Sequence, residues 1–249
     1  MIRTLSLIAV AGFVVALVCF GVAFGIAGGP FSIQDGAFRR WNWHTHDHGR
    51  MLVEHHAGDE ASVQRTLAWS GGDALAVSVP GEITYVQGPT PSLTIDGPDS
   101  LVKHVVVHDG RIELEPGVYD GDRLQIRLTA PGVHRFELDG DQALKIEAYD
   151  GDRLELVING SGSVTGAGKA ARVELSISGS GSADLSALAM DAAQVDISGS
   201  GDAVLGPRSS AKIDISGDGD VRLTTNPPVL QTDISGSGHV GTPKGDHTS

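Results

Sequence analysis

The residues best suited to chemistry lie in a short histidine-rich segment, Trp41-Asn-Trp-His-Thr-His-Asp-His48. If this segment is extended, His44, His46 and His48 lie on one face, and imidazole is a common ligand of zinc, copper and nickel. Asp47 then faces the other way and is a poorer fourth ligand. The spacing supports the hypothesis of a divalent metal site at these three histidines. The alternative, a flexible polar linker with solvated histidines, is the more common outcome for such a segment.

A second metal hypothesis concerns aspartates that follow Gly-Ser-Gly turns in the second half of the chain. These turns are similar to those of calcium-binding β-rolls, although their period is about double. Asp202 and Asp220 could share a cation between neighbouring turns. Calcium takes six to eight oxygen ligands, and each turn offers one acid or none. Solvated surface acids are therefore the favoured interpretation.

Enzyme motifs are weak in this sequence. Gly166–Ala171 fits a loose G-x-G-x-x-A pattern, but no helix is expected after it. The serines between glycines do not satisfy G-x-S-x-G. A sugar-cleaving β-helix needs two placed carboxylates, and Asp150 and Asp152, near Tyr149 and Arg153, are the cluster to test. We expect no catalytic residue, with carbohydrate processing as the enzymatic alternative.

The composition argues against nucleic-acid binding and against a core built on large rings. The 249 residues include 31 acidic and 18 basic side chains, for a formal net charge of -13, without a basic run. Binding to phosphates needs clustered lysine and arginine. The chain has 34 glycines and only 5% aromatic residues, whereas ordinary proteins contain about half that share of glycine.

An apolar N-terminal segment predicts attachment to a membrane. Residues 5–27 are uncharged, and as a helix they span about 34 Å, slightly more than the hydrocarbon core of a bilayer. We expect a single-pass membrane anchor, with residues 30–249 exported. The alternative is a cleaved signal sequence, which leads to secretion or surface exposure. Cys19, the one cysteine, lies inside this segment, so the exported part has no disulfide.

The second half of the chain repeats one glycine-rich phrase. Its first glycines stand at 160, 179, 199, 217 and 236, about 19 residues apart. Weaker copies, Asp120-Gly-Asp122 and Asp139-Gly-Asp141, precede them at the same interval. A period this regular predicts the stacked coils of a β-solenoid.

Apolar residues alternate within each copy, so each strand is expected to bury one face. The same parity places Gly179 and Gly181 inside the coil, where we expect a larger side chain to collide with the opposite wall. Stacking of coils about 4.8 Å apart turns equivalent positions into columns. Two outward polar columns are predicted: Ser161, Ser180, Ser200, Asp218 and Ser237; and Ser163, Ser182, Asp202, Asp220 and His239.

Residues 63–158 predict less regular strands. Arg65–Trp69 and Ala74–Val79 flank Ser70-Gly-Gly-Asp73, which indicates a hairpin. Ser100–His104 has the composition of a single helical turn. No long amphipathic helix is expected outside the N-terminal segment, so the chain is predicted to be all-β beyond residue 60.

The repeated phrase Asp196-Ile-Ser-Gly-Ser-Gly-Asp202 resembles the putative auto-transporter adhesin head domain, also called the GIN domain. Its relatives at 174–181, 214–220 and 233–238 do so too, as do the upstream Gly72-Asp-Ala-Leu, Val79-Pro80 and Tyr85-Val-Gln-Gly88. The resemblance covers about residues 65–240. It implies a β-helix-like fold with an irregular N-terminal portion, and it carries over no catalytic residues.

Together these patterns predict four segments. They are a membrane anchor or signal at 1–29, a His/Trp-containing linker at 30–62, a GIN-like β-solenoid at 63–240 and a polar tail at 241–249. The solenoid is expected to be irregular over 63–158 and regular over 159–240. The expected function is a non-enzymatic structural or adhesive role in the bacterial cell envelope, with the anchor in the inner membrane and the solenoid in the periplasm. The alternatives are metal binding or sensing through residues 44–56 and, less favoured, carbohydrate processing. The expected partners are the membrane, through residues 5–27, a second copy of the chain, and an envelope protein or glycan; nucleic acid is not expected.

Overall fold

A computed structural model of the protein describes residues 62–69, 71–118 and 121–243, all within the compact unit His55–Ser249. The apolar segment 5–27 and the three predicted histidine ligands lie outside these residues. Within the described ranges, no helix is long and apolar enough to cross a bilayer.

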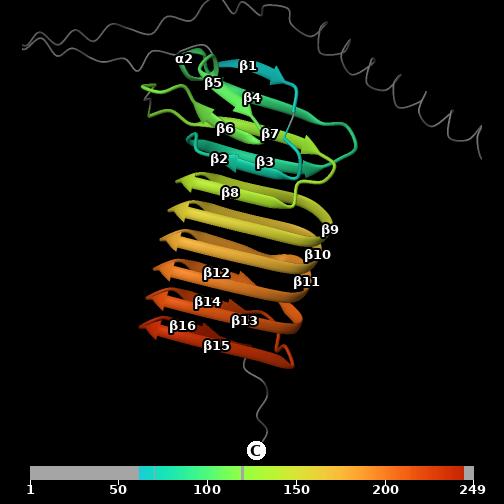
Figure 1. Ribbon diagram of the computed structural model, residues 1–249, viewed down its shortest axis with the longest axis vertical. Coiled ribbons are helices and arrows are strands. Elements are labelled where there is room, and N and C mark those ends of the chain that lie inside the picture. The colour runs from blue at the N-terminus through green and yellow to red at the C-terminus, as the bar shows by residue number, and fades with distance from the viewer. Residues whose placement is uncertain (1–61, 70, 119–120, 244–249) are drawn as a thin grey trace, which may run out of the picture. The chain divides into compact units, whose positions relative to one another are not determined.

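The second half of the described chain is a parallel β-solenoid, whose successive coils pair edge to edge (Figure 1). Its strands are β9 (Ala143–Gly160), β10 (Ser163–Gly179), β11 (Ser182–Gly199), β12 (Asp202–Leu205), β13 (Pro207–Gly217), β14 (Asp220–Leu223), β15 (Val229–Gly236) and β16 (His239–Gly241). Equivalent residues stand beside each other in the ladders, as Gly160, Gly179, Gly199, Gly217 and Gly236 do. The prediction of an all-β solenoid with coils of about 19 residues is confirmed. Regular stacking already begins at Ala143, before the repeats become regular in sequence.

The first half extends the stack in two branches and contains the short helix α2 (Asp99–Val102). Its strands are β1 (Ser62–Leu67), β2 (Ala74–Val77), β3 (Gly81–Gln87), β4 (Ser92–Pro98), β5 (Val105–His108), β6 (Arg111–Leu114), β7 (Leu124–Ala130) and β8 (Arg135–Gly140). One branch runs from β9 through β3, β7 and β4 to β1, and the other runs through β8, β2 and β6 to β5. The pairs β1–β4, β4–β7 and β5–β6 are antiparallel. This portion is therefore less regular, as predicted.

The predicted hairpin around Ser70–Asp73 is wrong, whereas the predicted helical turn is α2. Strand β1 pairs with β4, and β2 instead lies parallel to both β6 and β8. The reason is burial: in this arrangement Leu75 and Val77 of β2 enter the solenoid interior and are almost fully buried. Burial of such side chains contributes about 2 kcal/mol each, more than a two-stranded hairpin at the surface gains.

The interior consists of columns of aliphatic side chains, one from each coil. The isoleucine column contains Ile158, Ile177, Ile197, Ile215 and Ile234. Its first four members are at most 3% exposed. The alternation of buried and exposed residues follows the predicted parity along β10 and β11. The sequence pattern therefore identified the core face of the repeats correctly.

The corner glycines form two columns with different physical roles. Gly179 represents the first column, whose members have φ values from 121° to 143°, in a region that favours glycine. Gly181 represents the second column, which points inward. A Cβ there would stand 2.6 Å from the Cγ2 of Ile158, on the preceding coil, and 2.9 Å from the carbonyl oxygen of Gly162. The predicted collision with the opposite wall is therefore wrong, because the neighbour is the coil stacked directly beside it.

Candidate functional site

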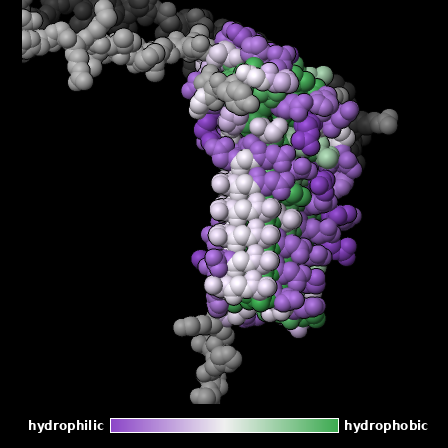
Figure 2. Space-filling model, turned by 60° about the vertical axis from the view of Figure 1, so that its left-hand side comes forward, coloured by the Kyte–Doolittle hydropathy of each residue, from purple (hydrophilic) through white to green (hydrophobic). Residues whose placement is uncertain are grey.

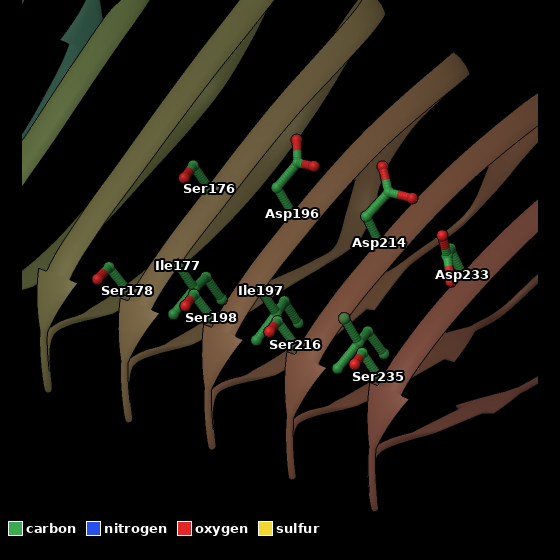
Figure 3. A pocket seen from close by; sticks show the side chains of 11 residues that line it. Ser176, Ile177, Ser178, Asp196, Ile197, Ser198, Asp214, Ser216, Asp233 and Ser235 are labelled. Carbon is green, nitrogen blue, oxygen red and sulfur yellow. The ribbon is translucent and has the colours of Figure 1, made fainter.

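The regular coils carry a polar face with two side-chain ladders, which we call the Asp/Ser face. It is formed by the ends of β10, β11, β13 and β15, just before each glycine corner (Figure 3). One ladder consists of Ser176, Asp196, Asp214 and Asp233, and the other of Ser178, Ser198, Ser216 and Ser235. Between them lies an open groove of about 390 Å³.

The repeat explains why these side chains are aligned. In the phrase Asp-Ile-Ser-Gly the isoleucine faces the core, so the aspartate and serine on either side face solvent. The parallel register then places Asp196 beside Asp214, and Asp214 beside Asp233. Adjacent parallel strands lie about 4.8 Å apart, so these carboxylates repel one another.

Neighbouring polar side chains offset part of this repulsion. The Nζ of Lys212 donates to the carboxylate of Asp214 at 2.6 Å, and the Nε2 of Gln194 donates to Asp196 at 3.2 Å. The hydrogen bond to Asp214 and the charge of that carboxylate raise the pKa of Lys212, and the charges of Asp196 and Asp233 raise it further. The face is therefore negative, with Lys212 at its edge.

On the same side of the earlier coils, the charges of acidic side chains are balanced by arginines. Arg153 pairs with Glu155 at 3.0 Å and with Glu174 on the next coil at 2.7 Å. Arg111 likewise lies 3.4 Å from Asp139. The excess of acidic groups is thus concentrated in the regular coils after β10.

The two predicted outward columns are present at the glycine corners. The residues of the polar column from Ser161 to Ser237 are exposed in every coil. The polar column from Ser163 to His239 runs in register from coil to coil. Figure 2 shows a stripe of residues of intermediate hydropathy (white) along the coils, as expected for corners rich in serine and glycine. Asp202 and Asp220 are direct neighbours across β12 and β14. Within 62–69, 71–118 and 121–243, however, no group of three or more His, Cys, Asp or Glu side chains could hold a metal ion.

A family model described as putative auto-transporter adhesin, head GIN domain, matches residues 73–227, which is more than half of the chain. The chain belongs to this family. The matched region includes β2 to β14 and therefore most of the solenoid and of the Asp/Ser face. The resemblance expected from the repeated phrase is confirmed.

One solved structure shares the fold of this GIN domain, and two others are also similar to the chain. A putative adhesin from Bacteroides fragilis NCTC 9343 is 18% identical, with a TM-score of 0.61, over 73% of this chain and 97% of that chain. A putative adhesin from Parabacteroides merdae ATCC 43184 is 19% identical, with a TM-score of 0.49, over 75% and 98%. A putative lipid binding protein from Parabacteroides distasonis ATCC 8503 is 16% identical, with a TM-score of 0.45, over 75% and 98%. Among curated proteins, none matches significantly.

The cluster proposed for sugar chemistry lies elsewhere in the GIN domain, beside a groove of about 600 Å³. Asp150 and Asp152 both line this groove, and Asp150 pairs with Lys169 at 3.2 Å. Tyr149 is only 4% exposed, and its hydroxyl donates to the backbone carbonyl of Arg153. Its ring is therefore part of the core and cannot serve as an exposed platform for a sugar.

Sequence reasoning missed the aspartate ladder, although the signal was present. The predicted columns were those of the corner residues, whereas Asp196, Asp214 and Asp233 occur at the same place in each Asp-Ile-Ser-Gly phrase. Extending the predicted parity two residues before the serine would have located them. The structure adds the groove and the position of Lys212, which the repeat alone did not specify.

Proposed function

We propose that this GIN-domain protein is a non-enzymatic structural or adhesive β-solenoid of the bacterial cell envelope, and that it makes contact through the Asp/Ser face. The observation that carries the proposal is the pair of unbroken polar ladders beside an open groove. Family membership supports an adhesive type of role.

A repeating face suits a repeating partner. Hydroxyl and carboxylate oxygens recur about every 4.8 Å along the coils, so an extended envelope glycan or protein strand can be hydrogen-bonded at several successive sites. Each exposed contact is weak, because water competes for the same groups. Several contacts on one ligand raise the overall affinity without any single strong site.

The proposal places the solenoid outside the inner membrane, held by residues 5–27 as a single-pass anchor. The uncharged length of this segment supports the anchor, and the absence of cysteine after Cys19 is compatible with an oxidising compartment. Cell fractionation with protease treatment of intact spheroplasts tests this part. Membrane-bound chain that is digested from the periplasmic side is expected, and chain protected in the cytoplasm contradicts it.

Binding to washed envelope fragments tests the contact face. Ser198→Arg and Ser216→Arg together fill the groove with long side chains, and we expect the fraction of full chain that sediments with the fragments to fall at least fivefold. Ser163→Arg and Ser182→Arg form the matched control, because these serines also stand on successive coils but lie outside the groove. Equal binding by the wild type and the groove variant, or equal loss in both variants, contradicts the proposed face.

A further inference from the structure

The last coil leaves part of the solenoid core uncovered. Strand β15 pairs with β13 on one side, and no described strand lies on its other side. Leu230 and Ile234, which occupy core columns, are 41% and 40% exposed, whereas Ile215 in the preceding coil is 3% exposed. Figure 2 shows apolar side chains reaching the surface at this end.

The first end of the solenoid is closed in a different way. Leu101 and Val102 of α2 are almost fully buried there. The guanidinium of Arg65 in β1 donates to the carbonyl oxygens of Val102 and Val105, at 3.3 Å and 3.1 Å. Strands β1 and β5 each have a free edge at this end, but the exposed large hydrophobic side chains among the described residues are Val229, Leu230 and Ile234. The uncovered core therefore lies at the β15 end.

Strand β15 lacks an inward-pointing charge that would protect its free edge. Its inward positions are Leu230, Thr232 and Ile234, none of which carries a charge. Natural edges are often protected by an inward-pointing charge or a covering segment. Residues 244–249 (Lys-Gly-Asp-His-Thr-Ser) bring no apolar side chain that could cover Leu230 and Ile234. The edge is therefore suited to pair with another strand.

We propose that β15 is a docking surface for a second copy of this chain, and that two solenoids join end to end about a two-fold axis. The exposed core residues lie on β15, so two copies of the chain bury these residues against each other only when their β15 ends meet. The contact is thus self-complementary and closes as a dimer, whereas head-to-tail contacts would build filaments. Related by this axis, the two β15 strands run antiparallel.

The sequence of β15 favours one register for this pairing. Core positions must stay inside in both copies, so even-numbered residues oppose even-numbered residues. With Thr232 on the axis, Leu230 lies opposite Ile234 of the second copy, and Gln231 lies opposite Asp233 of the second copy. Shifting the axis to Asp233 would place two like charges directly opposite each other, which is destabilising.

The residue on the axis also fits this arrangement. Thr232 continues a column whose earlier members, Leu175, Val195 and Ile213, are all aliphatic and buried. A threonine directly opposite its own copy can form a cross-strand hydrogen bond. Pro227 and Pro228 lack backbone donors, so the ladder between copies is confined to β15.

Disulfide crosslinking of the full chain tests both the contact and the register. In a Cys19→Ser background, Thr232→Cys places two cysteines on the axis, where opposing Cα atoms are about 4.5–5.5 Å apart, within disulfide range. Asp233→Cys is the matched control, because its two copies would be about 8 Å apart, beyond that range. Mild oxidation is expected to give a covalent dimer with Thr232→Cys at least fivefold more abundant than with Asp233→Cys. Equal crosslinking at the two positions overturns the register.

The apolar contact is tested by sedimentation equilibrium of the full chain in detergent. Leu230→Lys is expected to weaken dimerisation at least tenfold, whereas Val229→Lys, at an outward position on the same strand, is expected to change it less than threefold. Thermal unfolding of both variants controls for folding. A wild-type chain that sediments as a monomer or a trimer, or equal dissociation by the two variants, overturns the proposal.

Discussion

Ile158 fills the space that Gly181 leaves empty in the next coil. The Cγ2 of Ile158 lies 2.6 Å from the position of a Cβ on Gly181, closer than two carbon atoms can pack. The same relationship recurs between Ile177 and Gly201, at 2.6 Å. The isoleucine column and the inward glycine column are therefore one packing unit, and neither can change size alone.

The first prediction concerns this packing unit. Gly181→Val should lower the free energy of unfolding by about 3 kcal/mol, because the added methyl groups have no space beside Ile158. Ser180→Val, at an exposed position in the same corner, should change it by less than about 1 kcal/mol. Urea unfolding monitored by circular dichroism measures both. If the serine substitution is the more harmful one, the inward placement of Gly181 is wrong.

A double-mutant cycle isolates the contact itself. Gly181→Ala and Ile158→Ala are each expected to be destabilising, the first by crowding and the second by leaving a cavity. Ile158→Ala removes the Cγ2 methyl that meets the new Cβ, so the double variant should be more stable than the sum of the two losses predicts, by about 1 kcal/mol or more. Strict additivity would mean that the two residues do not share this space.

The second prediction concerns the glycine column of Gly179 and Gly199, whose members have positive φ values. Gly199 has φ 124°, and a Cβ there would meet the carbonyl oxygen of Gly179. Gly199→Ala should therefore cost at least about 2 kcal/mol, from backbone strain and crowding together. Gly72→Ala is the control, since nothing lies within 4 Å of its added Cβ. Equal melting temperatures for the two variants would contradict the assigned role of the corner.

The repeats could be predicted from the sequence because a coil contacts mainly its two neighbours, so period and parity determine most of the packing. The branching of the first half could not, because β2 joins β6 and β8 across long stretches of chain. The position of Gln142 could not be predicted either. It precedes Gly162 and Gly181 in their column, because the carbonyl oxygens of these three residues accept equivalent backbone hydrogen bonds in successive coils. The repeated sequence does not predict that a buried glutamine begins this column.

The candidate site was predictable to a similar extent. Polar columns followed from parity, and parity also places Lys212 and Asp214 on the same face of β13. The groove between the two ladders depends on how the coils bend, and a two-residue period does not describe that. The sequence also did not predict that the ring of Tyr149 is buried in the core and therefore unavailable to the predicted sugar cluster. Side-chain direction at an irregular corner is not fixed by a two-residue period.

The third prediction concerns stability at high pH. Burial, with smaller contributions from the charges of Tyr85 and Asp152, raises the pKa of Tyr149 to about 12. Because a raised pKa favours the protonated form in the folded state, the stabilisation is complete below pH 10 and is lost as the pH rises through 12. Wild type should lose about 2 kcal/mol over this window through Tyr149. Tyr149→Phe should be less stable at pH 7, by about 1 kcal/mol, but should lose less between pH 10 and 12.

Urea unfolding at fixed pH values from 8 to 12 measures this difference. The pKa of Tyr85 is also raised by burial, so Tyr149→Phe should keep part of the alkaline loss. Tyr85→Phe with Tyr149→Phe should flatten the profile further. Parallel loss of stability in wild type and in Tyr149→Phe would show that Tyr149 titrates in the folded state as it does in the unfolded chain.

The fourth prediction concerns calcium at the corner aspartates. Asp202 and Asp220 are adjacent, but the described residues around them supply no third acidic ligand, so a calcium ion would have to take most of its oxygens from water. We expect the melting temperature to shift by less than about 2 °C between EDTA and millimolar calcium. An increase of about 5 °C or more that Asp202→Asn with Asp220→Asn abolishes would restore the shared-cation hypothesis.

The fifth prediction concerns the histidine segment, which lies outside the described residues. If His44, His46 and His48 share a face, the full chain should bind zinc or copper with a stoichiometry near one, measured by calorimetry. Replacing all three with alanine should weaken binding at least tenfold, because three ligands are lost together. His55→Ala with His56→Ala is a matched control that removes nearby imidazoles but keeps the alternating set. Binding that is unchanged in the triple variant would assign the segment to a solvated linker and leave the envelope proposal to rest on the solenoid alone.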